Sequence, residues 1–183
     1  MKSFAFVFPG QGSQAVGMLD AWGDHPAVRQ TLDEASAALG QDLASLIHNG
    51  PKEDLALTTN TQPVMLVAGV AAYRAWRAEG GQAPAVVAGH SLGEYAALVA
   101  AEVLTLADAV PLVRLRAQAM QEAVPVGQGA MAAILGLTSA QVIEGCTQAQ
   151  ASFGADSTEV VDAANFNDPA QTVIAGKIGR AHV

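Results

Sequence analysis

The chain has 183 residues, of which 51% are hydrophobic, and it carries a net charge of −8 at pH 7. This length suits one domain or one and a fraction, and the nine scattered basic residues form no stripe that could follow nucleic acid phosphates. The single cysteine cannot form an internal disulfide, and the apolar run at the N-terminus is too short for a signal peptide. The sequence also has no uninterrupted apolar run long enough to span a membrane. We therefore expect a cytoplasmic protein that binds neither nucleic acid nor membrane.

The N-terminal part of the chain alternates between strand and helix signals. Residues 4–8 predict a buried first strand that runs into a glycine-rich loop, residues 10–14. Thr61 suits the N-cap of a long helix that has Pro63 in its first turn. Helices are expected over three stretches in which apolar residues recur at helical spacing: 26–39, 43–47 and 61–77.

The segment Gly89-His90-Ser91-Leu92-Gly93 follows a second predicted strand, residues 85–88, and precedes a helix. A G-x-S-x-G string between a strand and a helix is typical of a nucleophile elbow, which holds a serine hydroxyl out into a cleft. Its glycines are needed because larger residues do not fit where the strand turns into the helix. Ser91 is therefore the candidate nucleophile, and a purely structural turn is the alternative.

The second half of the chain predicts one more long helix and a small β-rich unit. The helix covers residues 105–122, with an apolar stripe that includes Met120. Arg114 and Arg116 are two positions apart on it and face about 200 degrees apart, so only one of them can point into a cleft. Cys146 is expected as a small core residue. The later elements match the start of a split βαβ unit: a strand at 131–137, a helix at 139–150 and strands at 160–165 and 172–175. The last of these strands is expected to be an unpaired edge.

Five motifs in this order resemble the malonyl-CoA:acyl-carrier-protein transacylases and the acyltransferase domains of polyketide and fatty acid synthases. They are Phe-Pro-Gly-Gln-Gly-Ser-Gln at 8–14, Thr-Gln-Pro at 61–63, Gly-His-Ser-Leu-Gly-Glu-Tyr at 89–95, Met-Gln-Glu-Ala-Val-Pro at 120–125 and Asn-Phe-Asn at 165–167. The resemblance implies an α/β fold: an α/β-hydrolase-like parallel-sheet core over residues 1–125 and a truncated ferredoxin-like small subdomain over residues 126–176. It also implies a full-length protein that is a monomer.

The resemblance further implies an acyl transfer in two steps. Ser91 would attack the thioester of malonyl-CoA, and the phosphopantetheine thiol of acyl carrier protein would then take the malonyl group from the serine. The backbone N–H groups of Gln11 and Leu92 would bind the oxyanion that forms at each attack. Arg116 would hold the free malonyl carboxylate through two parallel hydrogen bonds. The chemistry calls for no cofactor and no metal.

Three further residues are weaker substrate-side candidates. Gln62 lines the pocket in the family, but a glutamine at the start of a helix is as often a cap. Asn165 lies in the Asn-Phe-Asn motif near the end of a strand, although asparagines also favour turns. His90 is adjacent to Ser91 and is expected to support the elbow rather than to act as the general base.

The general base that Ser91 needs lies downstream of the Asn-Phe-Asn motif in the family. Of the four histidines, only His182 lies on that side, in the heptapeptide Lys177–Val183, where the resemblance has ended at Gly176. That heptapeptide can be encoded by AAG ATC GGA AGA GCA CAC GTC, which matches the start of a common sequencing-library adapter. We therefore expect residues 177–183 to be translated adapter, and the chain as written to be poorly stable and nearly inactive.

Three other functions remain open from the sequence. A serine esterase or thioesterase shares the elbow, but a hydrolase of neutral esters has no need of a carboxylate-binding arginine such as Arg116. A polyketide-type acyltransferase could use methylmalonyl or another extender unit. A non-catalytic fragment or binding module would follow from the missing base.

Overall fold

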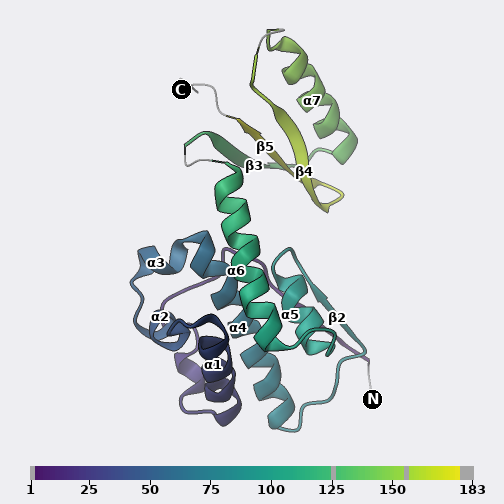
Figure 1. Cartoon of the computed structure of the whole chain (residues 1–183). Coiled ribbons are helices and arrows are strands. Elements are labelled where there is room, and N and C mark those ends of the chain that lie inside the picture. Colours follow the sequence, from purple (N-terminus) through teal and green to yellow (C-terminus); the bar gives the residue numbers. More distant parts are fainter. Residues whose placement is uncertain (1–2, 125–126, 155–156, 178–183) are drawn as a thin grey trace. The chain divides into compact units, whose positions relative to one another are not determined.

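The computed structural model describes residues 3–124, 127–154 and 157–177. They form two compact units, Met1–Gln121 and Glu122–Val183. The fold is mixed α/β: the first unit combines helices with a parallel sheet, and the second combines one helix with an antiparallel sheet (Figure 1). Residues 178–183 of the expected adapter-derived tail, with His182, lie outside the described residues.

The first unit is mainly helical and contains a long central helix, α4 (Thr58–Ala78). The prediction that Thr61 caps this helix is wrong, because α4 begins at Thr58 and the Thr61 hydroxyl donates to the Leu55 carbonyl at 2.6 Å. Pro63 therefore lies in its second turn rather than its first. The other elements are β1 (Ala5–Phe8), a 3-10 turn (Asp20–Trp22), α1 (Pro26–Leu39), α2 (Leu43–Asn49), α3 (Lys52–Ala56), β2 (Val86–Gly89), α5 (Gly93–Ala100) and α6 (Leu106–Ala123).

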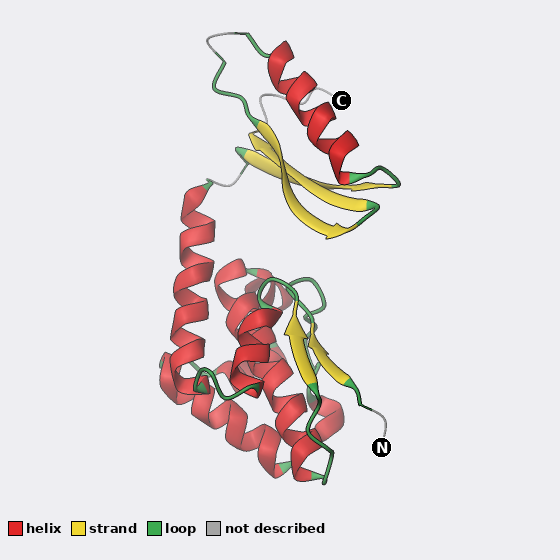
Figure 2. Ribbon diagram, turned by 90° about the vertical axis from the view of Figure 1, so that its right-hand side faces the viewer, coloured by secondary structure: helices red, strands yellow, loops and turns green. Residues whose placement is uncertain are grey.

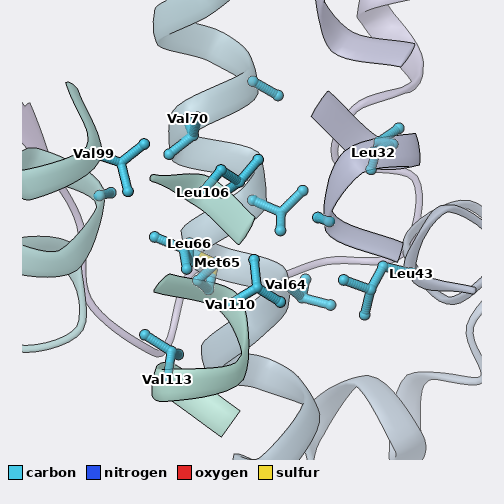
Figure 3. Close-up of a cluster of buried hydrophobic side chains, with 14 of the residues drawn as sticks. Leu32, Leu43, Val64, Met65, Leu66, Val70, Val99, Leu106, Val110 and Val113 are labelled. Carbon is cyan, nitrogen blue, oxygen red and sulfur yellow. The ribbon is translucent and has the colours of Figure 1, made fainter. Parts of the chain in front are cut away.

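The core of this unit is built around α4. Figure 3 shows part of it, with side chains of α4 and α6 lying together. The apolar stripe predicted for α6 is buried at Leu106, Ala109, Val110, Val113 and Ala117. Met120 departs from the prediction because 51% of it is exposed. The helix therefore packs through its first three turns.

Strands β1 and β2 pair in parallel, with Ala5 opposite Val86 and Phe8 opposite Gly89. The helices lie on one side of this pair (Figure 2). Phe8 is 4% exposed, whereas Val7 is 70% exposed and Val86 is 60% exposed. The prediction of a buried first strand therefore holds for the face that meets the helices and is wrong for the other face.

The second unit contains β3 (Gly129–Leu135), α7 (Ser139–Ser152), β4 (Val161–Asp168) and β5 (Gln171–Lys177). The strand order is β3-β5-β4, and both pairings are antiparallel. The prediction that residues 172–175 form an unpaired edge is wrong, because β5 is the central strand. Cys146 of α7 is 7% exposed, which confirms it as a core residue.

Within the described residues, no helix is both long enough and apolar enough to cross a membrane.

Candidate active site

The turn from β2 to α5 places Ser91 on the surface of the first unit. Ser91 has a φ of 51°, in the left-handed region that non-glycine residues seldom adopt. A Cβ on Gly89 would overlap the backbone of Gly93 and Glu94, and a Cβ on Gly93 would overlap the carbonyl of Phe8. The expectation that only glycine fits at these two positions is confirmed. The local sequence thus produces a tight turn with an exposed serine at its apex.

Arg116 of α6 reaches this serine. Its Nη2 donates a hydrogen bond to Ser91 Oγ at 3.1 Å, and its Nη1 donates to Gln62 Oε1 of α4 at 2.5 Å. Its Cζ lies 5.9 Å from the centre of the Tyr95 ring of α5. Helix α6 therefore brings a cation to the hydroxyl, and α4 and α5 bring an amide and an aromatic ring to that cation.

Arg114 points to different neighbours, as the helical spacing predicts. Its Nη2 donates to Gln41 Oε1, and to Asn60 Oδ1 at 3.3 Å. Burial lowers the pKa of Arg114 from its ordinary value, because the charged guanidinium loses contact with water. Arg114 is thus a structural cation, and Arg116 is the arginine at the elbow.

Gln62 is 1% exposed and lies inside α4, so its interpretation as a helix cap is wrong. Its Nε2 donates to Met120 Sδ at 3.4 Å, while its Oε1 accepts from Arg116. Met120 and Tyr95 also contact this cluster, and neither contact was predicted from the sequence. Helical spacing could have suggested Met120, which is four residues after Arg116 in α6. Tyr95 contacts Arg116 from a different helix, and no local pattern signals that.

The glycine-rich loop lies against the elbow. A Cβ on Gly10 would come within 3.0 Å of the His90 carbonyl oxygen and 3.2 Å of its Nδ1. The His90 backbone N–H also donates to Phe8 O at 3.1 Å, at the end of β1. The Gln11 side chain donates to Thr58 Oγ1 at 3.4 Å. This arrangement brings Gln11 and Leu92 into neighbouring turns, and their roles as oxyanion donors stay predictions.

The remaining candidates lie elsewhere. Asn165 is an exposed residue of β4, in the second unit, and its role stays a prediction. His25 lies 3.1 Å from Glu79 Oε1, and His48 contacts Asp20. Both of these histidines are therefore engaged with carboxylates, and neither suits the general base for Ser91.

A family model described as an acyl transferase domain matches residues 5–181 of the chain. The chain therefore belongs to the acyl transferase domain family. It is 56% identical over 177 residues to the malonyl CoA-acyl carrier protein transacylase of Escherichia coli strain K12; the match covers 96% of this chain and 55% of that protein.

Solved structures agree with this assignment. An acyl-carrier-protein S-malonyltransferase from Burkholderia pseudomallei is 63% identical, with a TM-score of 0.88 over 96% of this chain and 55% of that one. A malonyl-transacylase in complex with a type II polyketide synthase acyl-carrier protein is 48% identical, with a TM-score of 0.86 over the same shares. The chain thus spans about half the length of the curated relatives it matches.

Proposed function

We propose that this chain carries the nucleophile and the carboxylate-binding arginine of a site that moves a malonyl group from coenzyme A to acyl carrier protein, in fatty acid biosynthesis. The observation that carries the proposal is the 3.1 Å hydrogen bond from Arg116 Nη2 to Ser91 Oγ. A cation this close to Ser91 Oγ supports a role for Arg116 in holding the free carboxylate of a malonyl group on Ser91. The names of the relatives support this substrate and this partner.

In the first step, Ser91 Oγ attacks the thioester carbonyl of malonyl-CoA, the carbon–sulfur bond breaks, and coenzyme A leaves as a thiol with the serine proton. In the second step, the phosphopantetheine thiol attacks the malonyl-serine ester and the proton returns to Ser91. The N–H groups of Gln11 and Leu92 hold the oxyanion in both steps. Gln62 holds Arg116, and His90 contributes to the substrate side. Asn165, in the second unit, stays a predicted substrate-binding residue.

The same proposal extends to the architecture. Residues 1–125 form the N-terminal part of an α/β-hydrolase-like acyltransferase core, and residues 126–176 form part of a ferredoxin-like subdomain. Support comes from the parallel β1–β2 pair before the elbow and from the antiparallel β3-β5-β4 sheet with α7. We place the protein in the cytoplasm, as a monomer at full length.

The test is to incubate the 183-residue chain with malonyl-CoA, stop the reaction with acid and measure the mass of the intact chain and of the peptide that contains Ser91. Because neither His25 nor His48 can act as the general base, we expect loading to be slow and to stop at a single malonyl ester per chain. This ester should be absent in Ser91→Ala and strongly reduced in Arg116→Lys, because lysine cannot make two parallel hydrogen bonds. Acetyl-CoA is the matched control, and it should load poorly.

Each other outcome favours a different function. Equal loading from acetyl-CoA and malonyl-CoA, unchanged by Arg116→Lys, would favour a serine esterase or thioesterase. Preferential loading from methylmalonyl-CoA would favour the polyketide-type acyltransferase. A complete lack of ester in the wild-type chain would favour a non-catalytic module.

A further inference from the structure

The guanidinium of Arg116 is surrounded by neutral groups. Its contacts are Ser91 Oγ, Gln62 Oε1 and the face of Tyr95. Among the described residues, the ion pairs that the structure contains involve other side chains. Neutral partners hold the guanidinium without cancelling its charge, so the charge stays available for an anionic group at Ser91.

Tyr95 is well placed to fix this cation. It is the third residue of α5, the helix that begins two residues after Ser91. The ring is partly buried and packed against the hydrophobic core, which limits its motion. A guanidinium carbon 5.9 Å from the ring centre is within the range of a cation–π interaction.

We infer that Tyr95 is a positioning residue, which holds the plane of the Arg116 guanidinium so that its Nη2 edge faces the acyl group on Ser91. This inference rests on the proposed function, because it gives Tyr95 a part in binding the malonyl carboxylate. Once Ser91 carries an acyl group, its Oγ is an ester oxygen and a poor acceptor, so the hydrogen bond to Gln62 Oε1 is left to hold the guanidinium, which can then swing about Nη1. The ring face restricts that swing, and a two-point grip on a carboxylate needs a fixed plane.

The experiment titrates the 183-residue chain with the monomethyl ester of malonic acid, which carries one carboxylate and one ester carbonyl, as a malonyl thioester does. The side-chain N–H signals of Arg116, assigned by comparison with Arg116→Lys, are followed by 15N NMR. The neutral dimethyl ester is the ligand control. This measurement reports binding at Arg116 and needs no turnover.

Two variants of Tyr95 are compared with a matched control. We expect Tyr95→Leu to weaken binding of the monomethyl ester about 3- to 10-fold, and Tyr95→Phe, which keeps the ring face, to bind within about 2-fold of the wild type. Tyr73→Leu is the control, because Tyr73 is the other tyrosine, is also partly buried and packs on Phe6 and Phe8 instead. It should bind the ester as the wild type does.

A second series keeps the shape of the side chain and changes only its electrons. Phenylalanine with one, two or three fluorine atoms, incorporated at position 95, weakens the negative face of the ring step by step. We expect binding of the monomethyl ester to fall with each fluorine. A ring that serves only as packing would show no such trend, so this series decides the question even if Tyr95→Leu does not fold.

The outcomes separate the two proposals. Weaker binding in Tyr95→Leu and along the fluorine series, with Tyr73→Leu unchanged, supports the inference. If the ester binds through Arg116 but its affinity ignores position 95, the inference is overturned while the proposed function stands. If the ester does not shift the Arg116 signals of the wild type, or Arg116→Lys binds it equally well, the carboxylate-binding role of Arg116 is overturned, and the inference with it.

Discussion

The backbone conformation of Ser91 is energetically unfavourable for a serine. A φ of 51° at a residue with a Cβ is unfavourable by about 1 kcal/mol, and such strain is characteristic of functional turns. We predict that the free energy of unfolding of Ser91→Gly is about 1 kcal/mol higher than that of Ser91→Ala, although both variants lack the hydroxyl. Urea denaturation followed by circular dichroism measures the difference. Equal stabilities would show that the turn relaxes without strain.

Gly93 is required for a different reason: there is no room for a side chain at this position. A Cβ there would overlap the Phe8 carbonyl at the end of β1. We predict that Gly93→Ala lowers the free energy of unfolding by about 3 kcal/mol or prevents folding of the first unit. The matched control is Gly145→Ala in α7, where a Cβ meets nothing within 4 Å. It should raise stability by about 0.5–1 kcal/mol through better helix propensity. Similar losses in both would contradict the steric argument.

At the scale of elements, three helical segments meet at Arg114. Gln41 lies just before α2, Asn60 is in the first turn of α4, and both accept hydrogen bonds from Arg114 of α6. Its buried Nε has no hydrogen-bond partner among the described residues. The structure thus holds a partly buried cation with neutral acceptors, a position that a carboxylate would improve.

We predict that Gln41→Glu raises the free energy of unfolding at pH 7 by about 1 kcal/mol. The cation lowers the pKa of the introduced carboxyl in the folded state. The gain is therefore fully present above the ordinary glutamate pKa of about 4.3 and is lost as the pH falls below it. Gln30→Glu, on the exposed side of α1, is the control and should change stability by less than about 0.5 kcal/mol. A gain that persists at pH 3 would contradict an ion pair.

The elements show how far the sequence could be interpreted. Helix α1 begins and ends where it was predicted, because Pro26 starts it and Gly40 ends it. The start of helix α4 was predicted three residues too late, since Pro63 resembles a first-turn proline and the Thr58-Thr59-Asn60 segment has low helix propensity. Tertiary hydrogen bonds, from Asn60 to the Asp54 carbonyl and from Thr61 to the Leu55 carbonyl, hold that first turn.

The candidate site also has one part that the sequence predicts and another part that it does not. The elbow could be predicted because strand, glycines, serine and helix are consecutive, so local sequence alone determines the turn. The contacts of Arg116 with Gln62 and Tyr95 join residues that are far apart in the chain. The central position of β5 likewise depends on strand order, which local patterns do not encode. Tertiary packing decides these features.

At the scale of the whole molecule, the β1–β2 pair presents an apolar face to solvent. The side chains that alternate away from the helices are Ala5, Val7, Val86 and Ala88, and all four are exposed. Parallel strands with apolar residues on both faces are typical of sheets that are covered on both sides. An open sheet edge with such a face favours association between copies.

We therefore predict that the 183-residue chain self-associates as its concentration rises, and that the double variant Val7→Thr with Val86→Thr reduces this association. Threonine keeps the β-branched shape that suits a strand while it adds a hydroxyl, so the sheet should stay intact. Sedimentation velocity over a range of concentrations measures the association. The control is Val103→Thr, because Val103 is 66% exposed but lies outside the sheet. If Val103→Thr reduced association as much as the double variant, general surface hydrophobicity rather than the sheet face would be responsible.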